Sequence, residues 1–283
     1  MTDLPLDGLQ SRVRLNQGPE MPVLGLGVFQ TEPGPTTRHA VAWALAAGYR
    51  LIDTAALYGN EADVGAAVRE SGIPREEIFV TTKLWHTEHG RDRARRAFAA
   101  SRERLGLDYV DLYLIHWPRA ETPEARLASW EALEEIHAEG LARAVGVSNY
   151  AIRHLEEIVH RSHLVPAVNQ VEFHPFLYDP TVLRYAAEHG IRVQAYSPLT
   201  RNRRLDDPRI AAIAEEVGRT PAQVLVRWGL EHGVVEIPKS THRERIEENA
   251  RVFDFALSGA QRAALDALAD RRRVTQWNPE EIP

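Results

Sequence analysis

An alternation of two kinds of segment along the whole chain most constrains its fold. Apolar, β-rich runs recur about eight times and are separated by alanine-rich segments decorated with charges. The runs cover residues 23–28, 50–54, 78–83, 110–116, 144–149, 168–173, 193–197 and 234–238. The segments between them, such as 91–105 and 123–139, carry apolar residues at helical spacing. Strands that alternate with helices indicate a parallel sheet.

Eight such units predict an α/β fold of the (β/α)8, or TIM barrel, type, which commonly takes about 250 residues. No Pro-, Gly- or Ser-rich linker, shift in composition or fixed-period repeat divides the 283 residues, so we predict a single barrel domain over 1–283. A hairpin at 13–22 should close the barrel floor, and 271–283 should form a short C-terminal tail. A doubly wound sheet is the alternative, but Gly25 and Gly27 lack the third glycine of its dinucleotide-binding turn.

The composition excludes several classes of function. The chain has no cysteine, which excludes disulfides, thiolate nucleophiles and cysteine-ligated metals, so redox chemistry would need a bound cofactor. A net charge of −6 with interspersed acids and bases disfavours nucleic acid as a partner. The run of Arg201, Arg203 and Arg204 is predicted to be a solvated loop. Residues 1–8 lack a secretory pattern and no apolar run approaches about 18 residues, so we expect a cytoplasmic protein without a membrane partner.

Polar residues close most of the apolar runs, and in a barrel the carboxyl ends of the strands build the active site. These strand-end residues are Asp53, Lys83, His116, Asn149, residues 170–174, Tyr196, Ser197 and Lys239. Because parallel strands present these ends on one rim, we expect the side chains to gather there.

Lys83 indicates acid–base chemistry on this rim. An ammonium at the end of the run 78–83 would lie close to the core, where an unpaired charge is unfavourable, so we expect Asp53 on the neighbouring strand to pair with it. The pair would lie beside a hydroxyl such as Tyr58, whose pKa of ~10 we expect Lys83 to lower so that the phenol donates a proton near neutrality. His116 can hydrogen-bond a substrate carbonyl and orient it. Each residue alone also has an ordinary structural role as an alternative.

Three separated motifs resemble the aldo-keto reductase family, especially short bacterial members similar to 2,5-diketo-gluconate reductases. The motifs are GYRLIDTAALYGNEADVG at 48–65, RAVGVSNY at 143–150 and IPKSTHRERIEEN at 237–249. The resemblance covers nearly the whole chain and implies NADPH-dependent reduction of an aldehyde or ketone to an alcohol. It also implies that Tyr58 is the general acid, Lys83 and Asp53 its tuning pair, and His116 the residue that orients the carbonyl.

The same resemblance assigns the contacts to NADPH. Ser148, Asn149 and Gln170 would hold the nicotinamide carboxamide, and Tyr196 would stack on the ring. Ser197, Leu199 and Lys239 follow the last two strands, where barrels commonly bind phosphate. The 2′-phosphate would contact Lys239, Ser240 and Arg245, because an arginine fork and a lysine suit a phosphate monoester. Glu248 and Asn249 would lie at the adenine; a surface pair of Arg245 with Glu248 is the alternative.

Three aromatic residues bracket the proposed site, at positions where the family contacts substrate: Phe29, Trp85 and Trp117. Packing beside the strand ends is the alternative for each. Trp277 would close the pocket from the tail, the region where family members differ most in substrate choice. The expected partner is a small carbonyl compound, and family members of this length are often monomers.

Two other functions are alternatives for this sequence. One is a nicotinamide-nucleotide-sensing binding protein with slow residual reductase activity, as in channel-associated relatives of the family. The other is a metal-dependent barrel hydrolase or isomerase that uses Asp53, Glu172 and His174, although hydride transfer needs no metal and we predict no metal site.

Overall fold

Eight parallel strands form the barrel in the computed structural model, which describes residues 4–283. The strands pair in chain order from β3 to β10, and a parallel bridge between Leu24 and Glu236 joins the first region to the last. The barrel strands are β3 (Leu26–Gly27), β4 (Leu51–Asp53), β5 (Phe79–Leu84), β6 (Val110–Ile115), β7 (Ala142–Ser148), β8 (Val168–Glu172), β9 (Arg192–Tyr196) and β10 (Val235–Glu236). The predicted barrel is confirmed, and each predicted run overlaps one of these strands.

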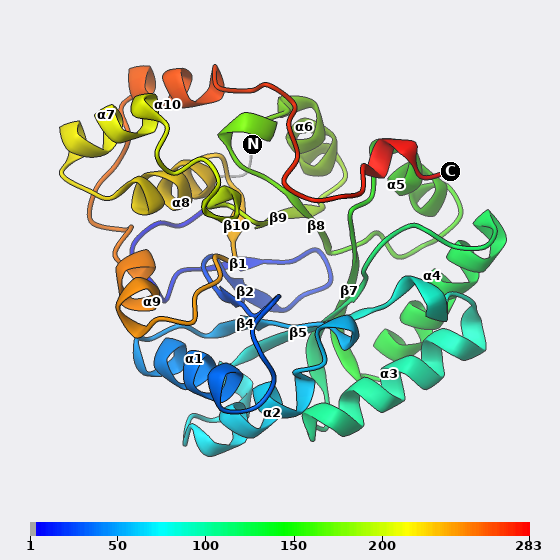
Figure 1. The fold of residues 1–283 in the computed structure, drawn as a ribbon. Coiled ribbons are helices and arrows are strands. Elements are labelled where there is room, and N and C mark those ends of the chain that lie inside the picture. Colours follow the sequence, from blue (N-terminus) through cyan, green and yellow to red (C-terminus); the bar gives the residue numbers. More distant parts are fainter. Residues whose placement is uncertain (1–3) are drawn as a thin grey trace.

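Helices surround the strands in a ring (Figure 1). They are α1 (Pro35–Ala46), α2 (Glu61–Glu70), α3 (Arg91–Leu105), α4 (Pro123–Ala138), α5 (Ile152–Val159), α6 (Pro180–Glu188), α7 (Pro208–Val217), α8 (Pro221–Glu231), α9 (Arg243–Ala250) and α10 (Gly259–Asp266). Thr122, Asp179 and Thr220 cap α4, α6 and α8 ahead of a proline, a combination that fixes where a helix begins. Within residues 4–283, no helix is long and apolar enough to cross a membrane.

Two glycines lie where the first barrel strand closes against the last. The Gly25 N–H donates to the Glu236 carbonyl at 2.8 Å, and the Gly27 N–H donates to the Pro238 carbonyl at 3.2 Å. A Cβ atom on Gly27 would lie 2.9 Å from the Ile237 carbonyl oxygen, closer than van der Waals contact. Gly27 therefore allows the close backbone approach that closes the barrel, whereas a Cβ atom on Gly25 would overlap the Leu51 side chain of β4.

The predicted N-terminal hairpin is present as β1 (Arg12–Arg14) and β2 (Glu20–Pro22), which pair antiparallel. In Figure 1 the hairpin lies across the centre of the ring. Gln17 in its turn accepts from the Val145 N–H at 2.9 Å and donates to the Val145 and Val165 carbonyls at 3.1 and 2.9 Å. The hairpin thus binds backbone groups of β7 and of the loop before β8.

His89, between β5 and α3, makes the fold sensitive to acid. Its ring nitrogens lie 2.8 Å from Ser129 Oγ and 3.0 Å from the Trp117 carbonyl, and burial lowers its pKa to about 4. The unfolded chain, with an imidazole pKa of ~6.5, binds a proton more readily than the folded chain between these values. The stabilisation of the folded state by neutral His89 is therefore complete above about pH 6.5 and is lost as the pH falls toward 4. It amounts to about 3 kcal/mol of the free energy of unfolding.

We expect the free energy of unfolding, measured by urea denaturation, to fall between pH 7 and pH 4, and to fall less in His89→Gln. The exposed His163 provides the matched control, because His163→Gln should keep the wild-type pH dependence. An identical pH dependence in His89→Gln and wild type would show that His89 does not contribute.

Candidate active site

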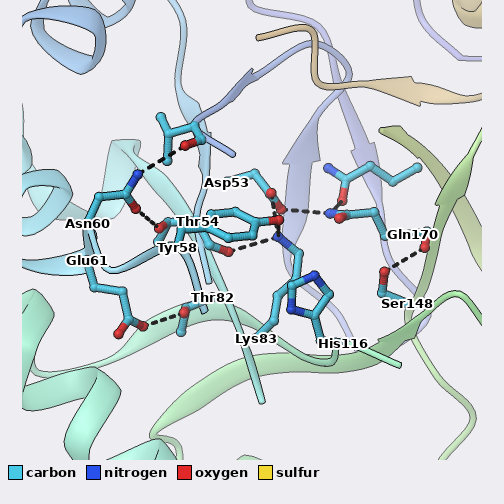
Figure 2. A network of polar contacts seen from close by, with 12 residues as sticks. Asp53, Thr54, Tyr58, Asn60, Glu61, Thr82, Lys83, His116, Ser148 and Gln170 are labelled. Carbon is cyan, nitrogen blue, oxygen red and sulfur yellow. Dashed lines mark hydrogen bonds and ion pairs between the residues drawn. The ribbon is translucent and has the colours of Figure 1, made fainter. Parts of the chain in front are cut away.

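Asp53, Tyr58 and Lys83 meet at the carboxyl ends of β4 and β5 (Figure 2). Lys83 is fully buried and Asp53 is 2% exposed, and Lys83 Nζ lies 2.5 Å from Asp53 Oδ1. Nζ also donates to the Thr54 carbonyl at 2.8 Å and to the Tyr58 hydroxyl at 3.2 Å. The ammonium therefore has three oxygen acceptors, one of which is the phenol. Three strand-end and loop residues singled out in the sequence are thus in direct contact.

A short turn after β4 carries Tyr58 and is held on both sides. Residues Ala56–Tyr58 form a 3-10 turn that ends at Gly59, whose φ of 68° is left-handed, a conformation that glycine adopts without strain. The Asn60 side chain then donates to the Val28 carbonyl at 3.0 Å and accepts from Thr54 Oγ1 at 2.7 Å. These bonds fix the turn against the barrel rim, so the phenol is presented to Lys83 by buried groups.

His116 follows β6 and meets the edge of the Tyr58 ring, with ring centroids 5.7 Å apart at an angle of 74°. Burial, together with the charge of Lys83, lowers the pKa of His116 well below its usual value, so the imidazole is neutral at physiological pH. Among residues 4–283, no group hydrogen-bonds its buried Nδ1. A neutral imidazole carries one N–H donor, which suits it to bind a carbonyl oxygen beside the phenol.

The electrostatics of Tyr58 differ from the sequence prediction. Burial and the charge of Asp53 raise the pKa of Tyr58 well above its usual value, whereas we expected Lys83 to lower it. Desolvation of the phenol is the largest cause, and the Asp53 carboxylate adds to it, whereas the charge of Arg201 acts in the opposite direction. The phenol is therefore protonated at neutral pH, which is the state that a proton donor needs.

Lysine is nearly absent from this chain. Of its 34 basic residues, 32 are arginine, and Lys83 and Lys239 are the two lysines. An ammonium is a compact point charge, whereas a guanidinium is a large planar fork, and only the former suits the enclosed space between Asp53, Thr54 and Tyr58. This compositional signal, which the motif-based predictions did not use, singles out two of the predicted site positions.

The four predicted nicotinamide contacts lie on and just after β7, β8 and β9, adjacent to Asp53. Gln170 Nε2 donates to Asp53 Oδ2 at 2.7 Å and to Gln194 Oε1 at 2.8 Å. Ser148 Oγ donates to the Gln170 carbonyl at 2.8 Å, and Tyr196 Oη donates to Asn149 Oδ1 at 2.6 Å. These side chains thus form one buried polar network with the Asp53–Lys83 pair. Gln194 was missed in the sequence, although it is a polar residue inside the apolar run 193–197.

The predicted phosphate and adenine contacts lie on the segment from Lys239 to Asn249, which contains the start of α9. Lys239 and Arg245 are exposed, and Ser240 is buried. Within the described chain, the Arg245 guanidinium has no carboxylate partner, and Asn249 is 3% exposed. The alternative pair of Arg245 with Glu248 does not form, because Glu248 accepts from Thr220 Oγ1 at 2.6 Å. A free guanidinium fits the 2′-phosphate of NADPH.

The four predicted aromatic residues lie around His116 and Tyr58. The Phe29 ring centroid is 5.0 Å from that of Tyr58, and the Trp85 centroid is 5.2 Å from that of His116. Trp277 from the tail stacks on Trp85 at 5.9 Å and meets Trp117 edge-on at 5.1 Å. The tail therefore does reach the site, as the sequence predicts.

The arginine run 201–204 is only partly the solvated loop that we predicted. Arg201 places its guanidinium 5.3 Å from the Phe29 ring centroid and its Nε 3.4 Å from Ser197 Oγ. Arg204 lies over the Phe176 ring at 3.4 Å and pairs with Asp270 at 2.6 Å.

The backbone explains why Arg201 was missed. Thr200, Arg201 and Asn202 have φ values of 52°, 53° and 61°, and three successive left-handed residues are not predictable from non-glycine residue types. The turn directs Arg201 toward the barrel mouth. Leu199, at the start of this turn, packs against the core.

The proposed metal ligands have other partners. Asp53 binds Lys83 and Gln170, and Glu172 binds His174 at 2.9 Å and the Val274 N–H at 2.6 Å. Residues 4–283 contain no group of three or more His, Cys, Asp or Glu side chains that could hold a metal ion. The alternative of a metal-dependent hydrolase or isomerase therefore has no ligand set in the part of the chain that the structure describes.

The family comparison agrees with the barrel fold. The model of the aldo/keto reductase family matches residues 23–270. The chain belongs to the aldo/keto reductase family, and carbonyl reduction by an oxidoreductase of this fold is its class of activity.

Several relatives match over nearly their whole length. A glyoxal reductase of Bacillus subtilis is 46% identical over 97% of this chain and 98% of its own. An uncharacterized oxidoreductase, YtbE, of the same organism is 47% identical over 94% of this chain and 95% of its own. The crystal structure of a Bombyx mori aldo-keto reductase in complex with NADP superposes with a TM-score of 0.89 at 35% identity, covering 100% of this chain and 99% of that chain.

Proposed function

We propose that this protein reduces an aldehyde or ketone to an alcohol with NADPH, and that Tyr58 protonates the carbonyl oxygen. The contact that carries the proposal is that of Lys83 Nζ with both Asp53 and the Tyr58 hydroxyl, at 2.5 and 3.2 Å. Burial of an ammonium beside a phenol costs desolvation free energy that packing alone does not explain. It has a clear chemical use where negative charge develops on the phenol oxygen.

The residues of the chain then have distinct tasks. Bound nicotinamide supplies the hydride that reaches the carbonyl carbon. Tyr58 Oη donates its proton to the carbonyl oxygen, and Lys83 Nζ donates to Oη and stabilises the charge that the departing proton leaves. Asp53 keeps the ammonium in place. His116, as a neutral N–H donor, binds the carbonyl oxygen and orients it toward Tyr58.

The cofactor would be held by residues on two sides of the barrel mouth. Ser148, Asn149 and Gln170 would bind the carboxamide, and Tyr196 would stack on the ring. Ser197, Leu199 and Lys239 would contact the phosphates. Ser240 and Arg245 would contact the 2′-phosphate together with Lys239, and Glu248 and Asn249 would contact the adenine. The buried polar network around Gln170 and the Arg245 guanidinium on α9, which has no carboxylate partner among the described residues, support this placement.

The free Arg245 guanidinium gives a quantitative expectation for cofactor choice. Hydrogen bonds to charged groups contribute about 1.5–3 kcal/mol, so Arg245→Ala should weaken NADPH binding roughly ten- to a hundred-fold and leave NADH binding nearly unchanged. The difference should shrink as salt rises, since an exposed contact is screened over about 8 Å at physiological ionic strength. Fluorescence titration of both cofactors against both proteins provides the four dissociation constants.

Arg243, two residues earlier, is the matched control for that titration. It is exposed and paired with Glu247 at 2.7 Å, so Arg243→Ala removes the same charge from the same helix without removing a proposed contact. Equal losses of NADPH and NADH binding in Arg245→Ala would show that Arg245 supports the fold or the adenine site instead.

Turnover tests the proposed activity against its rival. NADPH absorbance should fall on addition of aldehydes from a panel of sugars, keto acids, methylglyoxal and aromatic aldehydes, at a rate typical of enzymes, about 1–1,000 per second for the best substrate. A nucleotide-sensing protein would bind NADPH tightly but turn over every member of the panel far more slowly. Chelators should leave the rate unchanged.

The single-domain and monomeric states remain predictions, which calorimetry and sedimentation can check.

A further inference from the structure

A buried carboxylate at the end of β8 binds the C-terminal tail. Glu172 is 4% exposed, and its Oε1 accepts from the Val274 N–H at 2.6 Å and faces His174 Nε2 at 2.9 Å. Its Oε2 accepts from the Thr275 N–H at 3.2 Å and from the Thr275 hydroxyl. Burial raises the pKa of Glu172, but these donors outweigh burial and lower it overall. Glu172 is therefore a charged acceptor for two successive backbone amides of the tail.

A second anchor holds the far end of the tail. Arg153 Nη2 donates to the Glu280 carbonyl at 3.0 Å, His154 Nε2 lies 2.9 Å from the Ile282 carbonyl, and Arg126 Nη1 donates to the Pro283 carbonyl at 2.7 Å. Figure 1 shows this red segment passing over the barrel from β8 to α5. The segment between the two anchors, which includes Trp277, is thus held at both ends.

Trp277 lies in the part of the tail between the two anchors, beside the proposed active site. Its ring stacks on Trp85 and meets Trp117 edge-on, and Trp85 in turn meets His116 at 5.2 Å. The guanidinium of Arg119 lies 4.7 Å from the centroid of the Trp277 ring. Three tryptophans thus form a continuous aromatic wall that begins at the residue proposed to orient the carbonyl. A flat apolar substituent on that carbonyl compound would pack on this wall with little polar desolvation.

We propose that Glu172 is a positioning residue for substrate selection: it holds the tail so that Trp277 completes the aromatic wall, which favours carbonyl compounds bearing a flat apolar group. The inference rests on the proposed reductase function and specifies its substrate class. Glu172 contacts neither substrate nor cofactor in this scheme. It acts through the backbone amides of Val274 and Thr275 and through the Thr275 hydroxyl.

The test compares two substrates in matched variants. Glu172→Gln replaces one acceptor oxygen by an NH2 group facing tail donors, whereas Glu131→Gln makes the same change at an exposed residue of α4, away from the tail. With benzaldehyde, we expect KM to rise about ten-fold in Glu172→Gln and in Trp277→Ala, as loss of an aromatic contact of ~1.4 kcal/mol predicts. With glyceraldehyde, kcat/KM should change less than about two-fold. Glu131→Gln should match wild type on both.

Non-additivity separates positioning from a merely structural role. If Glu172 acts through Trp277, the double variant should show no further rise in KM for the aromatic aldehyde beyond Trp277→Ala. Thr275→Val removes the hydroxyl donor to Glu172 and keeps both backbone donors, so it should shift KM in the same direction by less, and it provides the readout if Glu172→Gln fails to fold. Hydrogen exchange should also be faster at the amides of Val274 and Thr275 in Glu172→Gln.

The outcomes are distinct. An unchanged ratio of the two substrates in folded, active Glu172→Gln, or additive effects in the double variant, would overturn the role of Glu172 and leave the reductase function standing. A wild-type protein that reduces neither aldehyde would overturn the reductase function, and this inference with it.

Discussion

Tyr58→Phe should lower kcat by about a hundred-fold or more, since general acid catalysis contributes typically ~10²–10⁴-fold. The substitution removes one oxygen and keeps the ring that packs against Phe29 and His116. The carbonyl oxygen would then lose its proton donor, while the neutral His116 imidazole still binds it. NADPH affinity should change little, because Tyr58 is not among the proposed cofactor contacts.

Single-turnover kinetics at saturating NADPH is the appropriate measurement for this variant, since it reports the chemical step directly. Tyr49→Phe is a matched control, because the Tyr49 hydroxyl is buried and donates to the Ile246 carbonyl at 2.9 Å, away from the rim. That variant should lose stability but keep kcat. Retention of more than half of the wild-type rate by Tyr58→Phe, on several aldehydes, would rule out Tyr58 as the proton donor.

Lys83→Met should reduce kcat to a similar extent and should also destabilise the fold. The variant leaves Asp53 buried without its cation, and breaking a buried ion pair costs about 3–5 kcal/mol. It also removes the donor that stabilises charge on the Tyr58 oxygen. Lys83→Arg should not restore the rate, because the larger planar group does not fit the position that a fully buried ammonium occupies.

Folding must be established before the rate of Lys83→Met is interpreted. Circular dichroism and NADPH titration provide that check, and Arg203→Met, at an exposed position, controls for the loss of one positive charge. Lys83→Met that is folded, binds NADPH and keeps wild-type kcat would contradict the proposed role of the ammonium.

The residues that the sequence predicts well are those fixed by local pattern. Asp53, Lys83 and His116 each close an apolar run, and a parallel barrel necessarily presents such residues on one rim. The hairpin at 13–22 follows from a turn between two short extended segments. Tyr58 lies on a turn outside any strand, so its place in the site came from the resemblance to a family and not from periodicity.

The features that the sequence did not predict depend on contacts between distant segments. Glu172 and Val274 are 102 residues apart, and no local pattern connects them. The pKa of Tyr58 was predicted in the wrong direction because it depends on the burial of the phenol and on the nearby Asp53 carboxylate, both of which are set by the folded barrel rim. Arg201 reaches Phe29 only because three successive residues adopt left-handed backbone angles.

Direct hydride transfer to the carbonyl carbon is the central claim, and an isotope measurement tests it most directly. NADPH deuterated on the transferred position at C4 of the nicotinamide should be mixed with the wild-type protein and an aldehyde in ordinary water, and the alcohol analysed by mass spectrometry and NMR. The account predicts one deuterium on the carbinol carbon of each product molecule, with one NADPH oxidised per alcohol formed. Alcohol without deuterium at that carbon, or no NADPH oxidation with any aldehyde of the panel, would contradict it.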